Sequence, residues 1–202
     1  MARLRQPVRM PAAKLRKLAL AGADARPWYD WALAEIQAAA PILGVTETRL
    51  ADLLALFSPR TSVKKSVRLT VHYIRTGGHV HDVLPMVRVG VAYYEATREI
   101  RGCKTAPFAK ALMGDKSAVV LDTWMAVAFG VDPNWIKDRP KLRRRMAATL
   151  QRVADSLGWP VAETQAAIWA ATVRGQGPYA KLRTIGLLEE INRPAEVDDL
   201  PI

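Results

Sequence analysis

The chain lacks several features that define common classes of protein. Cys103 is its one cysteine among 202 residues, which excludes an internal disulfide, a four-cysteine zinc site and a four-cysteine iron–sulfur cluster. It has no uninterrupted run of about 18 apolar residues, so we expect no membrane-spanning helix. The basic start, MARLRQPVRMPAAKLRK, lacks the apolar core of a secretory signal. The single cysteine fits a reducing cytoplasm, and the basic start is either a flexible arm or a mitochondrial-type presequence.

Alternating strand patterns and glycine-rich phosphate-binding loops are missing as well. The strand-like run SAVVL, residues 117–121, is short. Apolar residues elsewhere repeat at helical spacing, so we predict an all-α fold of roughly eight to ten helices. The lack of a glycine-rich loop between a strand and a helix disfavours α/β nucleotide-binding enzymes.

The helical repeats also suggest how the chain is organised. We predict a basic N-terminal arm over 1–26 that contains at most one short helix, a single helical domain over 27–191 and an acidic tail over 192–202. The expected helices within the domain cover residues 27–40, 46–57, 63–75, 83–99, 104–113, 122–130, 139–157, 161–173 and 178–191. Thr46 and the turn SPRTS at 58–62 supply residue types that cap helix starts.

Charge of one sign dominates the sequence. Lysine and arginine number 30 against 19 acidic residues, which gives a net charge of +11. An excess of this size indicates a polyanionic partner, most often nucleic acid. The helix over 63–75 places Lys64, Lys65 and Arg68 off its apolar stripe, and the helix over 139–157 has an arginine-rich outer side. Together with Arg60, the first set is either a grip on DNA phosphates or a solvated face.

A turn that contains Gly102 precedes the helix that opens near Lys104. Free backbone N–H groups at such a helix start bind a phosphate without reading base sequence, and glycine lets the two backbones approach closely. We therefore expect Gly102, Cys103 and Thr105 to contact DNA. Taken alone, Lys104 is a solvated surface charge and Asp122, after an apolar run, is a helix cap.

Taken together, these segments resemble a known family. GCKTAPFAKAL and SAVVLDTWM are similar to the hairpin and catalytic segments of the helix-hairpin-helix DNA glycosylase superfamily, which includes endonuclease III and 8-oxoguanine glycosylase. LLALFSPRTS resembles a helix end in these enzymes, so the resemblance covers at least residues 46–130 and is nearest to small phage-type and bacterial members. The hairpin keeps one glycine, Gly102, where the family usually has two. Trp124 replaces the family's histidine.

The resemblance implies a two-lobed helical fold without an iron–sulfur cluster, with hairpin and catalytic segment at 98–130. It implies that Asp122 stabilises the positive charge that builds on the sugar when an N-glycosidic bond breaks. It places Lys104 where an unprotonated amine attacks the sugar and forms a Schiff base. It also places Ser58 and Arg60 beside the flipped base or the gap that the base leaves. We expect Trp124 to line the pocket, and the other tryptophans to belong to the core.

The expected function is that of a monomeric DNA glycosylase without metal or cofactor. Such an enzyme flips a damaged or modified base out of duplex DNA, excises it, and cleaves the strand as an AP lyase through Lys104. One alternative keeps the fold but directs it to hypermodified phage-type bases, in base modification or antiphage defence. A second alternative is a non-catalytic DNA-binding module. The expected location is the cytoplasm, in association with the nucleoid.

Overall fold

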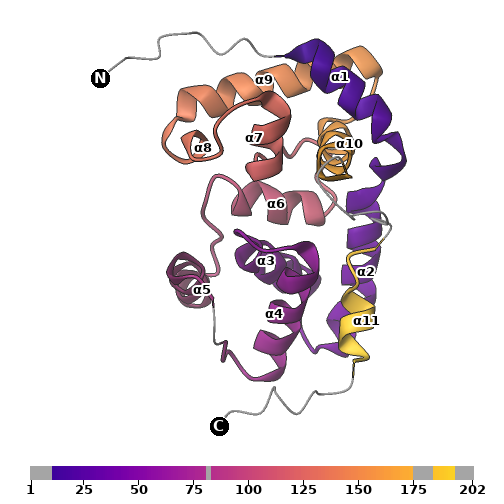
Figure 1. Cartoon of the computed structure of the whole chain (residues 1–202). Helices are drawn as coiled ribbons and strands as arrows, with labels where there is room; N and C mark the ends of the chain where they lie inside the picture. The colour runs from indigo at the N-terminus through magenta and orange to yellow at the C-terminus, as the bar shows by residue number, and fades with distance from the viewer. Residues whose placement is uncertain (1–10, 81–82, 175–183, 194–202) are drawn as a thin grey trace.

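The computed structural model describes residues 11–80, 83–174 and 184–193, and these residues form helices joined by turns, with no strand among them. The all-α prediction is confirmed. Figure 1 shows the arrangement. In chain order the elements are α1 Ala12–Ala21, the short 3₁₀ helix η1 Ala23–Ala25, α2 Trp28–Ile42, α3 Glu47–Phe57, α4 Val63–Arg75, α5 Pro85–Thr97, α6 Thr105–Leu112, α7 Thr123–Phe129, α8 Trp135–Asp138, α9 Pro140–Leu157, α10 Val161–Arg174 and α11 Leu187–Ile191.

Side-chain caps fix several helix starts where the sequence predicts them. The Thr46 side chain accepts a hydrogen bond from the Arg49 backbone N–H at 3.2 Å. Ser62 accepts one from the Lys65 N–H, also at 3.2 Å. Each cap satisfies one of the N–H groups that a helix start leaves unpaired. Asp82, whose type and position before the helix predicted over 83–99 suit an N-cap, lies outside the described residues. So do the stretch 178–183 of the last predicted helix and the tail from 194.

Two buried apolar clusters divide most of the core between them. The first, here the α2 cluster, gathers side chains from α2, α3, α4, α6 and α11, including Ile36, Leu50, Val67, Leu112 and Leu187. The second, here the α9 cluster, gathers side chains from α1, α7, α8, α9 and α10, including Leu15, Met125, Met146, Leu150 and Ile168. A smaller third cluster holds α5 against α3 through residues such as Val87, Val91 and Tyr94.

The run SAVVL connects the two large clusters. Its residues are not helical, and alternate side chains enter opposite clusters. Ala118 and Val120 belong to the α2 cluster, whereas Val119 and Leu121 pack into the α9 cluster. Extended backbone sends successive side chains to opposite sides, and this explains why an unpaired segment reads like a strand. The segment ends at Asp122, which therefore lies where the two clusters meet.

Helix α10 is the central element of the fold. Ten of its 14 residues are buried, and it packs against α1, α2, α7 and α9. Ala162 and Ala166 face the α2 cluster, while Val161 and Ile168 face the α9 cluster. A helix buried on most of its circumference is typical of a domain centre.

Part of the expected N-terminal arm is built into the fold. The sequence predicts an arm over 1–26, but residues 12–25 form α1 and η1, and α1 packs against α9 and α10. Leu15 and Ala19 are fully buried. A Cβ on Gly22 would lie 2.0 Å from the Ala167 carbonyl oxygen, so glycine permits the close approach to α10. Two buried side chains among several lysines and arginines are a weak apolar signal, so the sequence did not indicate how closely α1 packs against the rest of the fold.

Candidate functional site

Lys104 is held between the start of α6 and the end of α3. It is the residue that precedes α6, and it is partly buried. Its Nζ donates a hydrogen bond to the Ser58 carbonyl oxygen at 3.0 Å, and it lies 5.7 Å from the centre of the Phe108 ring. Ser58 is the residue that follows α3, so the lysine adds a side-chain donor to a carbonyl at the helix end that otherwise accepts a long hydrogen bond, 3.5 Å, from the Thr61 N–H.

The turn before Lys104 depends on its glycine. Gly102 has a φ of +118°, and a Cβ at this position would lie 2.4 Å from the Thr105 hydroxyl oxygen. The Thr105 hydroxyl in turn donates a hydrogen bond to the Arg101 carbonyl. Any residue other than glycine is strained here by both its backbone angle and its side chain. The turn leaves Gly102 and Cys103 exposed to solvent at the start of α6.

Asp122 begins α7, where its side chain is an N-cap. Its Oδ1 accepts a hydrogen bond from the Met125 N–H at 2.8 Å. The backbone N–H of Trp124 and the side chain of Trp169 on α10 also donate hydrogen bonds to this carboxylate. Asp122 is partly buried. A capping role is therefore present, and it leaves the carboxylate at the junction of α7, α10 and α6.

Lys104 and Asp122, which are 18 positions apart in the chain, act on each other electrostatically. Burial lowers the pKa of the Lys104 amine, and the charge of Asp122 opposes that shift. Burial raises the pKa of the Asp122 carboxyl, against the Met125 hydrogen bond and the charge of Lys104. Among the described residues no ion pair within 4.0 Å joins the two groups. Each group thus stays closer to its neutral form than it would in water.

A continuous set of aromatic rings, here the aromatic bridge, links the two groups. Phe108 lies beside Lys104 and stacks on Trp28, with ring centres 6.3 Å apart and planes 17° apart. Trp28 contacts Trp169 at 5.8 Å, and Trp169 reaches Asp122. The bridge therefore brings α2, α6 and α10 to the same place. Aromatic faces around a charged pair lower the local dielectric and strengthen its field.

Two polar atoms beside the bridge have contrasting environments. Tyr29 donates a hydrogen bond from its hydroxyl to Gln165 at 2.7 Å, and burial together with the charge of Asp122 raises the pKa of the Tyr29 hydroxyl. Trp28 Nε1 is buried and has no hydrogen-bond partner among the described residues. A buried, unpaired N–H costs about 1–3 kcal/mol. The burial of Trp28 beside the site therefore carries an energetic cost that no hydrogen bond among the described residues offsets.

The remaining predicted site residues are placed in different ways. Ser58 is buried, and its hydroxyl donates to the Ala55 carbonyl, so its side chain turns inward and is not offered to a partner. Arg60 is exposed in the turn between α3 and α4, with a left-handed φ of 57°. Lys64, Lys65 and Arg68 are exposed on α4. Trp124 is partly buried on α7 and contributes its backbone N–H to Asp122.

Sequence reasoning missed the role of Phe108, Trp28 and Trp169 at this site. The assignment of Trp28 to the core is confirmed, since the residue is 5% exposed, but the ring also forms part of the aromatic bridge. Phe108 follows Lys104 by one helical turn, and this spacing was the available signal for their contact. Trp169 is 47 positions beyond Asp122, and no local pattern could have indicated that contact.

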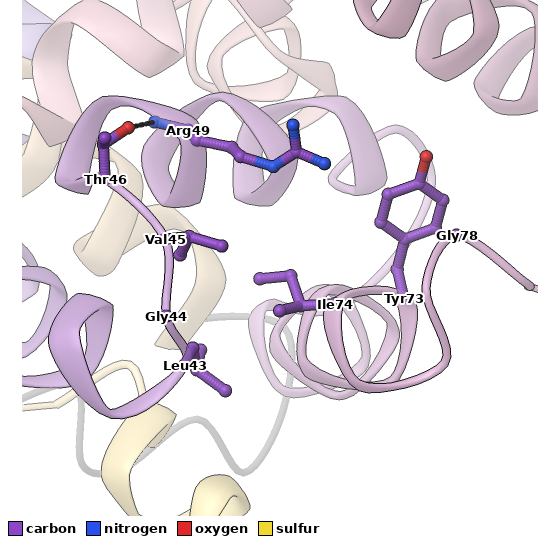
Figure 2. Close-up of a pocket in the computed structure, with 8 residues that line it drawn as sticks. All are labelled: Leu43, Gly44, Val45, Thr46, Arg49, Tyr73, Ile74 and Gly78. Atoms are coloured by element: carbon purple, nitrogen blue, oxygen red, sulfur yellow. Dashed lines mark hydrogen bonds between the residues drawn. The ribbon is translucent and has the colours of Figure 1, made fainter.

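A cavity of about 450 Å³ lies elsewhere, between the ends of α2 and α4 and the start of α3. Figure 2 shows its lining, in which the Arg49 side chain extends toward Tyr73. None of the predicted site residues lines it. The Arg49 guanidinium is already bound to Glu95, with N–O distances of 2.8 and 3.3 Å. This charge is therefore occupied by the fold itself.

The comparisons with known proteins place the chain in one family. Residues 19–177 match the family described as "Family of unknown function (DUF7178)". The match covers more than half of the chain, which therefore belongs to that family. Curated proteins and solved structures gave no match.

None of the helices in the described residues has the length and apolar character required to cross a bilayer. The same residues contain no cluster of three or more histidine, cysteine, aspartate or glutamate side chains arranged to bind a metal ion.

Proposed function

We propose that the chain is a DNA glycosylase with a two-lobed fold of the helix-hairpin-helix type. The observation that carries the proposal is the meeting of Lys104 and Asp122 at one partly buried junction, with the pKa of the lysine lowered. The net charge of +11 supports a nucleic-acid substrate. The turn at Gly102, whose backbone is exposed beside Lys104, supports a phosphate contact close to the same junction.

In the proposed reaction, Asp122 acts as a carboxylate held close to the sugar of a flipped nucleotide. As the bond from C1′ to the base breaks, its electron pair leaves with the base and positive charge develops on the sugar. A fixed carboxylate in a low-dielectric setting stabilises that charge without reorganisation. The three hydrogen bonds to Asp122 hold it in position and oppose the rise in pKa that burial produces.

Lys104 supplies the nucleophile in the same proposal. The neutral amine forms a bond to C1′ and loses a proton, and the sugar ring opens to give an imine between enzyme and DNA. Elimination of the 3′ phosphate then cleaves the strand. A protonated lysine has no electron pair to donate, so the lowered pKa of Lys104 increases the reactive fraction at neutral pH.

The test is a screen for base release from duplexes that carry oxidised, deaminated, alkylated or phage-type hypermodified bases. Mass spectrometry identifies the released base, which separates a repair substrate from a hypermodified one. We expect release of at least one class by the wild-type protein and loss of that release in Asp122→Asn. Wild-type protein that releases no base from any duplex contradicts the proposal.

A second candidate function, a non-catalytic DNA-binding module, is favoured by one observation. The Lys104 Nζ donates to the Ser58 carbonyl and thereby ties α6 to the end of α3, which is a structural use of the amine. In that case the protein binds duplex DNA and releases no base. The same screen, combined with a binding measurement, distinguishes the two functions.

A further inference from the structure

A basic surface that the proposed site does not use extends over α1 and α9. We define the α1–α9 basic surface by its exposed cations Lys14, Arg16 and Lys17 on α1 with Lys141, Arg144 and Arg152 on α9. The two helices pack against each other, as Figure 1 shows. Asp155 is the single acidic residue in both helices, and it accepts a hydrogen bond from Gln151. The two helices therefore carry far more positive than negative charge.

The fold does not neutralise this charge internally. In the part of the chain that the structure describes, Lys14, Arg16, Lys17, Lys141 and Arg144 have no acidic partner within 4.0 Å. Other cations of the fold do have such partners. Examples are Arg26 with Glu163, Lys116 with Asp30, and Arg174 with Asp24. Charge is thus paired where helices join and left unpaired on this surface.

The position of the charges along α9 also argues against a purely stabilising role. Its first turns contain Lys141, Arg143 and Arg144 and no acidic residue, while its last turn contains no basic residue. Cations at a helix start oppose the helix dipole and cost roughly 0.3–1 kcal/mol each. Lys141 and Arg144 also repel each other across one turn. An arrangement that lowers helix stability indicates a partner that supplies negative charge.

We propose that the α1–α9 basic surface is a second nucleic-acid-binding surface that holds the phosphate backbone of a duplex. The 18 residues of α9 extend over about 27 Å, which matches the rise of about eight base pairs. The planar guanidinium group of an arginine can donate two hydrogen bonds to the oxygens of one phosphate. Helix α4, with Lys64 and Lys65, lies at the opposite end of the molecule, with α6 between the two (Figure 1). The surface is therefore distinct from the DNA contacts predicted on α4.

A membrane is the less suitable partner. A helix that lies on a bilayer needs an exposed apolar face beside its cations. The apolar stripe of α9, which includes Leu142, Met146 and Leu150, is buried in the α9 cluster. Leu20 on α1 is the one large apolar side chain that the two helices expose.

The inference is tested by the salt dependence of binding to a lesion-free duplex of about 30 base pairs, measured by fluorescence anisotropy from about 50 to 200 mM salt. Each phosphate contact that is lost reduces the log–log slope by about 0.9. We expect Lys141→Gln/Arg144→Gln to reduce the slope by about 1.8. The control Arg88→Gln/Lys110→Gln removes one lysine and one arginine from exposed positions of α5 and α6, and should leave the slope unchanged. Adding Lys14→Gln/Lys17→Gln to the α9 variant should reduce the slope further.

Equal slopes for the α9 variant and its control overturn the inference, and so does a wild-type slope near zero. Circular dichroism melting of each variant verifies that the fold is intact. Flotation with phosphatidylserine vesicles tests the membrane instead: vesicle binding that the α9 variant loses while its DNA slope is unchanged overturns the proposal. Failure of the glycosylase proposal is distinguishable, because the slopes are measured on DNA without a lesion and require no base release.

Discussion

Two regions of the molecule each bring a cation close to a carboxylate, but only one of them joins the two groups in an ion pair. At the edge of the 450 Å³ cavity, Glu95 accepts hydrogen bonds from two nitrogens of Arg49 and from the hydroxyl of Tyr73, and pairs with Arg98. At the junction of the two large clusters, Lys104 donates to a backbone carbonyl, and Asp122 accepts from N–H groups. Glu95 is therefore paired with two arginines, whereas no ion pair within 4.0 Å joins Asp122 to Lys104.

The contrast indicates which set is suited to chemistry. A carboxylate whose oxygens already accept hydrogen bonds from two guanidinium groups and a hydroxyl has little capacity left for a substrate. Lys104 and Asp122 are both shifted by burial toward their neutral forms, and each retains exposed surface. Groups with such opposed shifts at one place are typical of functional sites.

The largest effect is expected for Asp122→Asn. Asparagine caps a helix nearly as well as aspartate, so DNA binding and thermal stability should stay close to wild type. The charge that stabilises the sugar cation is lost, and base release should fall by at least about a hundredfold. Single-turnover base release and duplex affinity are the two measurements.

Asp115→Asn is the matched control, because Asp115 also accepts a hydrogen bond from a backbone N–H close by in sequence. Its base release should equal that of the wild type. Unchanged base release in Asp122→Asn would leave Asp122 with the capping role alone. The functional contrast between Asp122 and Glu95 would then be lost.

The next effect concerns covalent trapping. Borohydride reduces an imine to a stable amine, so wild-type protein should be joined covalently to DNA that carries an abasic site. Lys104→Ala should lose this product and the accompanying strand cleavage, while slow base release persists if Asp122 directs water to the sugar. Lys110→Ala on the same helix is the control and should be trapped normally. A trapped complex of equal yield in Lys104→Ala would show that another amine reacts.

The pH dependence of trapping sharpens the comparison further. Because burial lowers the pKa of Lys104, the reactive amine forms at lower pH than in a free lysine. The trapping rate should therefore rise with pH and level off below about 10.4, the ordinary lysine value. Asp122→Asn removes a charge that raises the pKa of Lys104, so its profile should shift to lower pH. Abasic DNA makes this measurable without base release. Identical profiles would mean that the two groups are not coupled.

The same lowered pKa has a defined effect on folding. The unfolded chain holds the Lys104 proton more tightly than the folded chain, so the stability contributed by this group is present above the ordinary lysine pKa. That contribution is lost as the pH falls through the folded value. Lys104→Met should flatten this part of the dependence of unfolding free energy on pH.

The smallest effect is expected for Glu95→Gln. The substitution removes the charge that Arg49 and Arg98 share, in a partly exposed setting, and should lower the free energy of unfolding by about 1 kcal/mol. Urea denaturation measures the change, and Glu99→Gln, in an exposed pair with Arg101, should produce a smaller one. Base release should be unaffected by either. A catalytic loss in Glu95→Gln as large as that in Asp122→Asn would erase the distinction between the two regions.

The sequence predicts the parts of this structure that depend on local rules. Thr46 and Ser62 cap helices because a hydroxyl can reach an N–H three residues away, and that geometry is fixed by spacing. Leu142, Met146 and Leu150 mark the buried side of α9 because they recur with the helical period. The same local logic predicted a turn at Gly102, and the structure gives this glycine a φ of +118°.

Features that depend on contacts between distant segments could not be read in this way. The Tyr29–Gln165 hydrogen bond joins residues 136 positions apart, and the aromatic bridge brings α2 and α10 together. Helix α1 shows two fully buried residues amid several cations, so its packing against α10 exceeds what its pattern indicates. The inward turn of the Ser58 hydroxyl follows from the exact end of α3. Periodicity predicts which residues are buried, whereas their partners depend on topology.

The contact between Trp28 and Trp169 has an optical consequence. Their indole rings lie 5.8 Å apart with planes inclined by 52°, so their electronic transitions couple. Two coupled chromophores in a fixed chiral arrangement give a pair of ultraviolet circular dichroism bands of opposite sign. Helix α2 and helix α10 each carry one ring, and the signal therefore exists when the two helices are docked beside Asp122. The protein thus contains an intrinsic spectroscopic reporter of the geometry of its own candidate site.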